Sequence, residues 1–228
     1  MIVTDRLVFL HLHKSGGTFV NDFLLRFFPD ARHIGYHLPR AYLPDLALGL
    51  PIFGLVRNPW DYYVSWYSFQ AEKTQPNALF RVTSHDRRLG FADTVANLVN
   101  LSGNRGHFGA IAAALPERFI NRGINLTRQC FSPLYGSGLG FYSFLYRRMF
   151  GDGEGVTFGR MESLRGDLLA FFESIGLALT DEMREFVLRA APVNTSRHGS
   201  YQQYYDAALR QLVAERDREV IARFNYEF

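Results

Sequence analysis

The chain has 228 residues, of which 47% are hydrophobic, and it carries a formal net charge of +3 at pH 7. This length and composition suffice for one substantial core, so we expect a single domain over residues 1–228. The charge is mild and forms no basic block, so we expect no nucleic-acid partner.

A single cysteine, Cys130, cannot form an internal disulfide and has no partner for a cysteine-based metal site. The apolar run near the N-terminus is short and is interrupted by His11 and His13. No basic region precedes that run, so the sequence predicts neither a signal peptide nor a transmembrane helix. We therefore expect a cytoplasmic protein.

The stretch from Arg6 to Phe28 predicts a strand, a glycine turn and a helix, because an apolar run is followed by apolar residues at helical spacing. Between them lie Lys14, Ser15, Gly16, Gly17 and Thr18. Paired glycines let backbone N–H groups turn inward, and the helix start adds further donors, so the turn suits an anion. The lysine charge and the two hydroxyls favour a phosphate or sulfate group. The alternative is a well-capped turn with a solvated lysine.

Lys14 and Lys73 are the only lysines in the chain. A compact ammonium fits where a planar guanidinium does not, which favours a specific role for Lys14. The lysine precedes the glycines, whereas the nucleoside-triphosphate loop GxxxxGK[ST] places it after them. The order disfavours a metal-dependent kinase or NTPase, which stays an alternative.

A second apolar run, Pro51 to Val56, reads as a buried parallel strand. Asn58 is a candidate N-cap and Pro59 suits the first helical position, so we expect a helix over residues 60–70. Arg57 then lies at the carboxyl end of the strand, on the same edge as Lys14. Ser65 is about two helical turns further on and can converge with Arg57 on one anion. Taken alone, Arg57 also fits a surface ion pair and Ser65 an ordinary helix residue.

The two stretches HLHKSGGTF and LVRNPWDYYVSWYSF together resemble the cofactor-binding signatures of sulfotransferases that use 3′-phosphoadenosine 5′-phosphosulfate (PAPS). The resemblance implies an α/β, three-layer P-loop-like fold with a central, mostly parallel sheet flanked by helices. It implies that residues 14–18 bind the 5′-phosphosulfate and that Arg57 and Ser65 bind the 3′-phosphate. Many relatives have proline where this chain has His13. The ending DREVIARFNYEF is also typical of the family, so the resemblance covers most of the chain.

The segment 71–155 is the most irregular part of the sequence, and we expect it to recognise the acceptor. Within it, residues 91–101 look helical and residues 103–109 look broken by glycine. Residues 141–150 are rich in aromatic side chains, with Arg147 and Arg148 expected on a solvated edge. Further on, the sequence predicts a strand over residues 156–160, helices starting near Ser163 and Thr180, and a last helical region over residues 204–224.

The polar loop before the last helical region contains Asn194, Ser196 and Arg197. Similar loops in the family close over the nucleotide, so the resemblance implies that these three residues bind the cofactor. A polar loop before a helix is also an ordinary feature.

Sulfuryl transfer to a hydroxyl needs a base, and histidine titrates near neutrality without a large pKa shift. His37 lies before the second strand, where carbohydrate-acting members of the family place a catalytic histidine. We therefore assign His37 as the base, and His37 and Lys14 are the two predicted catalytic residues. The alternative is a surface histidine in a loop. His33 is the second choice, and His11 and His13 are expected to be core or edge residues.

The sequence therefore predicts a sulfotransferase that transfers a sulfuryl group from PAPS to an acceptor hydroxyl, with adenosine 3′,5′-bisphosphate as product. Carbohydrates and glycoconjugates are the candidate acceptors. The leaving phosphate is a good one, so no metal is expected. The alternatives are a kinase-like phosphotransferase and an inactive nucleotide-binding module.

Overall fold

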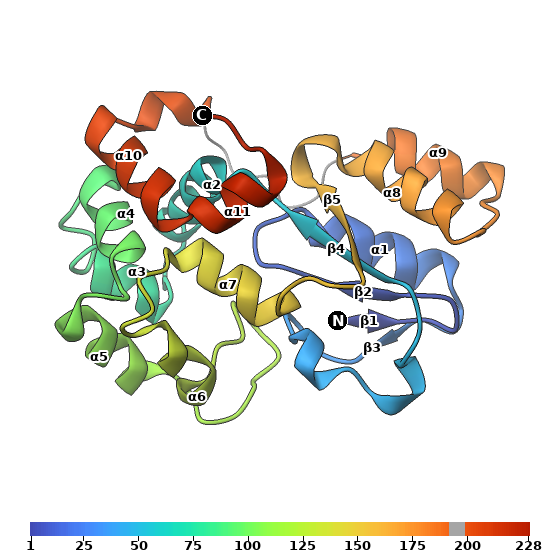
Figure 1. The fold of residues 1–228 in the computed structure, drawn as a ribbon, viewed down its shortest axis with the longest axis horizontal. Helices are drawn as coiled ribbons and strands as arrows, with labels where there is room; N and C mark the ends of the chain where they lie inside the picture. Colours follow the sequence, from blue (N-terminus) through green and yellow to red (C-terminus); the bar gives the residue numbers. More distant parts are fainter. Residues whose placement is uncertain (192–198) are drawn as a thin grey trace. The chain divides into compact units, whose positions relative to one another are not determined.

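The computed structural model describes residues 1–191 and 199–228. The backbone groups into two compact units, one made of Met1–Arg57 and Arg147–Thr195 and the other of Asn58–Tyr146 and Ser196–Phe228. Figure 1 shows the elements of both units along the chain. The expectation that residues 1–228 act as one domain stays a prediction.

The first unit contains a five-stranded sheet in the order β3-β1-β2-β4-β5. Its strands are β1 (Ile2–Val3), β2 (Val8–Leu10), β3 (Arg32–His33), β4 (Ile52–Val56) and β5 (Val156–Arg160). Strands β2, β4 and β5 are parallel neighbours, while β1 pairs antiparallel with β2 and with β3. The predicted α/β fold is confirmed, and the sheet is mixed. The carboxyl ends of the three parallel strands share one edge.

Three helices cover one face of this sheet, and the last residue of a fourth packs on the other. On one face lie α1 (Gly17–Phe27), α8 (Leu164–Ser174) and α9 (Asp181–Arg189). Phe53 of β4 points to that side, where its ring stacks on Phe171 of α8 at 4.7 Å between centroids. The next residue, Gly54, points to the opposite face. There a Cβ atom would lie 2.5 Å from the ring of Phe150, the last residue of α7 (Phe141–Phe150).

The predicted elements of this unit are largely confirmed. The apolar run from Leu7 contains β2, the run from Pro51 contains β4, and residues 156–160 form β5. Thr180 caps α9, because its hydroxyl accepts a hydrogen bond from the backbone N–H of Met183 at 3.2 Å. Ser163 is the N-cap residue of α8 by position, but its hydroxyl donates to Asp167 at 2.6 Å.

The second unit contains most of the helices. They are α2 (Pro59–Ala71), α3 (Ala78–Thr83), α4 (Phe91–Val99), α5 (Arg105–Ala114), α6 (Arg128–Phe131), α10 (Ala207–Arg216), α11 (Arg218–Phe224) and the start of α7. The predicted cap of α2 is confirmed, because the Asn58 side chain accepts a hydrogen bond from the N–H of Trp60 at 3.0 Å. Among residues 1–191 and 199–228, no helix combines the length and the apolar character needed to cross a membrane.

The prediction of a glycine break over residues 103–109 is confirmed for residues 103–104 and wrong for residues 105–109. Helix α5 contains both Gly106 and Gly109. The Asn104 side chain starts the helix by accepting a hydrogen bond from the N–H of His107 at 3.0 Å, and the buried Ile111 anchors it. A cap and one apolar contact therefore outweigh the low helix propensity of the two glycines.

The last helical region is two helices that meet at Asp217. Its carboxylate is fully buried and accepts hydrogen bonds from the hydroxyl of Tyr63 and the backbone N–H of Ser143, each at 2.7 Å. Burial raises the pKa of this carboxyl group to about 6, although the two hydrogen bonds favour its charged form. The break thus places a buried acceptor between α2, α7 and the two C-terminal helices within the second unit.

Candidate functional site

The turn between β2 and α1 needs glycine at two successive positions. Gly16 has a left-handed backbone (φ 79°), and a Cβ atom on it would lie 2.4 Å from the sulfur of Met161. A Cβ atom on Gly17 would lie 2.1 Å from the imidazole of His11, which is itself buried. The turn therefore packs closely against His11, the residue after β2, and against Met161 and Leu164 at the start of α8, and no larger residue fits without displacing them.

The other residues of the turn surround the start of α1. Ser15 is fully buried, and its hydroxyl donates to the carbonyl of His13 at 3.4 Å. Lys14 and Thr18 are half-buried. Within the described part of the chain, no side chain caps the N-terminus of α1, and its first turn carries no acidic residue. The backbone N–H groups there suit an anion.

Arg57 lies beside this turn. It follows β4, the parallel neighbour of β2, and its side chain is largely buried. One of its terminal nitrogens, Nη1, donates a hydrogen bond to the backbone carbonyl of Lys14 at 3.1 Å. The predicted proximity of Lys14 and Arg57 is confirmed. Both cations belong to the edge where the parallel strands end, the usual place for a ligand in such a sheet.

The backbone at Lys14 is strained. Its φ angle is 59°, in the left-handed region that residues other than glycine rarely occupy. Such a conformation costs on the order of 1–3 kcal/mol and persists only where the surroundings hold it. The hydrogen bond from Arg57 is one such restraint, since it binds the carbonyl of the strained residue itself.

His37 is buried, with 2% of its surface exposed, so the alternative of a surface histidine is wrong. Its Nδ1 lies 2.6 Å from the carbonyl oxygen of His11. A carbonyl oxygen only accepts hydrogen bonds, so Nδ1 carries the proton in the neutral ring and Nε2 carries the lone pair. The backbone of His37 is also left-handed, with φ 46°.

Three aromatic side chains surround the His37 ring. The ring centroids of His11, His13 and Tyr36 lie 4.3, 5.3 and 4.1 Å from it. His11 is in turn tied to α1, because its Nδ1 lies 3.2 Å from the side-chain nitrogen of Asn21. His11 and His13 are therefore buried parts of the cluster, while His33 lies exposed on the short strand β3.

Burial lowers the pKa of His37 to about 3 and the pKa of His11 well below its ordinary value. Both rings are therefore neutral near pH 7. A neutral imidazole is the form that accepts a proton, although a pKa this low makes it a weak base. A bound anion would raise the pKa of His37, because a nearby negative charge favours the protonated ring.

Arg148 does not lie on the solvated edge that its sequence position predicts, because its guanidinium Nη1 donates a hydrogen bond to the carbonyl of His37 at 3.3 Å. Arg148 is half-buried, whereas the preceding Arg147 is exposed. The sequence carries one signal for this difference. The two arginines are adjacent on a helix whose next residues, Met149 and Phe150, are buried, so they cannot both face the same way.

Ser65 lies on α2 and is buried, with 1% of its surface exposed. It belongs to the second unit and Arg57 to the first, so their convergence on one anion stays a prediction. Asn194, Ser196 and Arg197 lie outside the described residues, and their role likewise stays a prediction. Among the described residues, no three His, Cys, Asp or Glu side chains gather in a group that could hold a metal ion.

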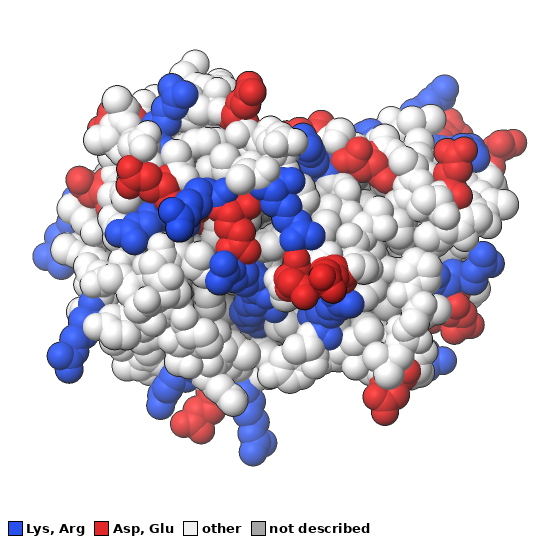
Figure 2. All heavy atoms as spheres, viewed as in Figure 1, with Lys and Arg blue, Asp and Glu red and all other residues white. Residues whose placement is uncertain are grey.

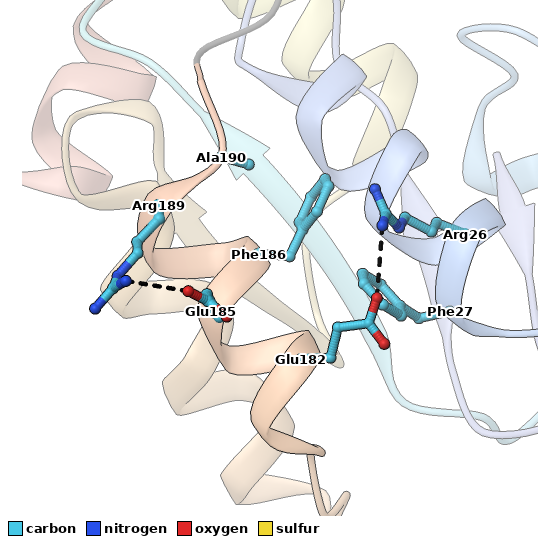
Figure 3. Close-up of a pocket in the computed structure, with 7 residues that line it drawn as sticks. All are labelled: Arg26, Phe27, Glu182, Glu185, Phe186, Arg189 and Ala190. Carbon is cyan, nitrogen blue, oxygen red and sulfur yellow. Dashed lines mark hydrogen bonds and ion pairs between the residues drawn. The ribbon is translucent and has the colours of Figure 1, made fainter.

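A pocket of about 310 Å³ lies between the end of α1 and α9 (Figure 3). It is lined by Arg26, Phe27, Glu182, Glu185, Phe186, Arg189 and Ala190. Its ion pairs, Arg26 with Glu182 and Arg189 with Glu185, are exposed and contribute little stability. None of the predicted site residues lines the pocket, which adjoins the end of α1 opposite the turn formed by residues 14–18.

Charged side chains of both signs are interspersed on the face drawn in Figure 2. This face carries no extended field of one sign.

No protein-family model matches the sequence. No curated protein matches it either. Among solved structures, the chain is similar to mouse sulfotransferase SULT7A1, in a crystal structure complexed with PAP. The TM-score is 0.52 at 13% identity, over 94% of this chain and 85% of that one. At this identity the likeness shows the fold alone, and the fold of this chain is a sulfotransferase fold.

The tight contact at Gly17 yields a test of the turn. We expect Gly17→Ala to destabilise the protein by about 1–3 kcal/mol, because the added methyl group would overlap the buried His11 ring. It should also weaken the binding of adenosine 3′,5′-bisphosphate, since the turn must shift. Urea unfolding and calorimetry measure the two effects.

Gly109→Ala in α5 is the matched control, because nothing lies within 4 Å of its Cβ position. Alanine is a better helix former than glycine by about 1 kcal/mol, so this variant should be as stable as the wild type or more so. A Gly17→Ala protein with wild-type stability and wild-type binding would contradict the close packing of the turn.

Proposed function

We propose that this protein is a sulfotransferase that transfers a sulfuryl group from PAPS to an acceptor hydroxyl. The observation that carries the proposal is the hydrogen bond from Arg57 to the carbonyl of Lys14, at the end of two parallel strands. It joins the two predicted parts of the nucleotide site that lie in the first unit. The sulfotransferase fold, seen in an enzyme complexed with PAP, supports the same conclusion.

In this proposal the turn formed by residues 14–18 binds the 5′-phosphosulfate. Its backbone N–H groups, the Lys14 ammonium and the hydroxyls of Ser15 and Thr18 are the donors. Arg57 and Ser65 bind the 3′-phosphate. A guanidinium has five N–H groups, so Arg57 can hold the Lys14 carbonyl and still donate to a phosphate. Asn194, Ser196 and Arg197 complete the nucleotide site.

The reaction forms a bond between the acceptor oxygen and sulfur and breaks the bond between sulfur and the 5′-phosphate oxygen. Negative charge develops on that leaving oxygen. A cation placed beside it lowers the barrier more than it tightens ground-state binding, and we assign this role to Lys14. The leaving phosphate departs readily, and the mechanism needs no metal ion.

The acceptor hydroxyl must lose its proton as the new bond forms. We assign this proton to Nε2 of His37, because Nδ1 is committed to the His11 carbonyl. The dianionic phosphosulfate beside His13 and Lys14 would raise the pKa of His37 from its low value and strengthen it as a base.

The acceptor is a hydroxyl compound, for which carbohydrates and glycoconjugates are our candidates on the basis of the resemblance. We assign its recognition to the segment 71–155, and we place the protein in the cytoplasm. A kinase-like activity is the enzymatic alternative, which calorimetry with nucleotides separates from sulfuryl transfer.

Calorimetry tests the nucleotide first. We expect adenosine 3′,5′-bisphosphate to bind without magnesium, and more tightly than ATP or adenosine 5′-monophosphate. Arg57→Ala should weaken binding of the bisphosphate on the order of ten- to a hundredfold, as loss of a charged hydrogen bond does, and weaken the monophosphate less. Arg32→Ala, which removes an exposed arginine on β3, is the control.

Equal losses for both nucleotides would contradict the assignment of Arg57 to the 3′-phosphate. Magnesium-dependent turnover of ATP, with no binding of the bisphosphate, would favour the kinase-like alternative.

The burial and the low pKa of His37 favour one second candidate, a nucleotide-binding module without transfer activity. The pH dependence of kcat/KM for PAPS tests the assignment of His37 as the base, since it reports ionisation in the enzyme before PAPS binds. A group whose pKa is lowered stays deprotonated down to that lowered value. We therefore expect the acidic limb well below pH 6, and we expect His37→Ala to lose transfer while it still binds the bisphosphate.

An acidic limb of the kcat/KM profile near pH 6.5 would show that another group acts as the base. Transfer at wild-type rates by His37→Ala would also contradict the assignment of His37. Nucleotide binding by the wild type, without transfer to any hydroxyl in a broad acceptor panel, would favour the module.

A further inference from the structure

Two residues with proposed roles in the reaction share an uncommon backbone. Lys14 and His37 both have positive φ angles, 59° and 46°. In each case the backbone carbonyl of the strained residue accepts a hydrogen bond from an arginine, Arg57 for Lys14 and Arg148 for His37. Strained conformations persist only where surrounding contacts hold them, so each arginine restrains the residue that presents the reactive side chain.

Arg148 is well placed for such a restraint. It lies in the last turn of α7, and the two residues that follow it, Met149 and Phe150, are buried. The Phe150 ring packs over Gly54 of β4 and lies edge-on to Phe158 of β5, with 5.0 Å between the two ring centroids. The turn that carries the guanidinium is therefore anchored on the same sheet whose strands carry the anion-binding turn.

We propose that Arg148 is a positioning residue for the transfer reaction. By binding the His37 carbonyl it fixes the strained backbone that holds Nδ1 of His37 on the His11 carbonyl and presents Nε2 to the acceptor. The role of Arg148 in transfer rests on the proposed function, whereas the positioning of His37 is a property of the ligand-free protein.

Arg148 adds positive charge beside His37 near neutral pH. The groups that face His37 are His11, His13, His33, Tyr36, the amino group of Met1 and Arg148. Burial lowers the pKa of His11 and His33 and lowers that of the Met1 amino group to about 5, so these groups are neutral near pH 7. Burial raises the pKa of Tyr36, which is neutral as well. Removing the guanidinium should therefore raise the pKa of His37.

Three variants separate the roles of this side chain. Arg148→Met removes both the charge and the hydrogen-bond donor. Arg148→Gln removes the charge but keeps an N–H donor, and Arg148→Lys keeps both in another geometry. Arg147→Met is the matched control, because it removes an exposed arginine one position earlier. Thermal unfolding of each variant shows whether the fold is retained.

The first readout is the nitrogen-15 NMR spectrum of the His37 imidazole in the ligand-free protein. We expect one tautomer, protonated at Nδ1, in the wild type and in Arg147→Met. Arg148→Met should give mixed tautomers and a higher His37 pKa, and Arg148→Gln a higher pKa with the tautomer retained. If Arg148→Met and Arg147→Met give the same tautomer and the same titration, the proposal is wrong whether or not the protein transfers sulfate.

The second readout is transfer from PAPS. Arg148→Met should lower kcat on the order of ten- to a hundredfold, as small displacements of a reacting group do, with KM for PAPS within about twofold. Arg148→Lys should recover part of kcat, and the acidic limb of kcat/KM should move to higher pH in Arg148→Met. If Arg148→Met changes the tautomer and the pKa of His37 but the wild type transfers no sulfuryl group, the proposed function is wrong and the positioning role of Arg148 stands. An unchanged kcat in folded Arg148→Met would refute the role in the reaction.

Discussion

The hydrogen bond from the Arg57 guanidinium to the Lys14 carbonyl is the interaction on which the rest of the candidate site depends. It exists because β2 and β4 are parallel neighbours, so that the residues after their carboxyl ends meet. It brings the Lys14 ammonium, the Arg57 guanidinium and the N–H groups at the start of α1 together within one unit of the structure. Groups arranged in this way provide the N–H donors and the positive charge that an anion-binding site needs.

The same region shows how burial and strain shape the chemistry. Gly16 and Gly17 are required because the turn lies against Met161 and His11, and the His11 carbonyl in turn selects the tautomer of His37. A displacement of the turn would therefore move His11 and change the hydrogen bond that orients the His37 ring. The low pKa of His37 follows from burial. In the proposed reaction, the negative charge of the bound PAPS would raise this pKa, so that the imidazole becomes a stronger base.

The sequence predicted those features that are encoded locally. Apolar runs marked β2, β4 and β5, and side-chain caps marked the starts of α2 and α9, because each signal lies within a few residues of its effect. Strands β1 and β3 have two residues each and are defined by pairing across the sheet, which leaves no periodic pattern. The glycines of α5 suggested a break that the Asn104 cap prevents. The hydrogen-bond partner of Arg148 could not be predicted from the neighbouring residues, because this partner, His37, is far away in the sequence.

The most direct test of the central claim is a crystal structure of the protein with adenosine 3′,5′-bisphosphate bound. The account predicts the 5′-phosphate within hydrogen-bonding distance of the Lys14 ammonium and the N–H groups of residues 16–18, with Arg57 in contact with the 3′-phosphate. A nucleotide bound elsewhere, with the turn occupied by water alone, would contradict it.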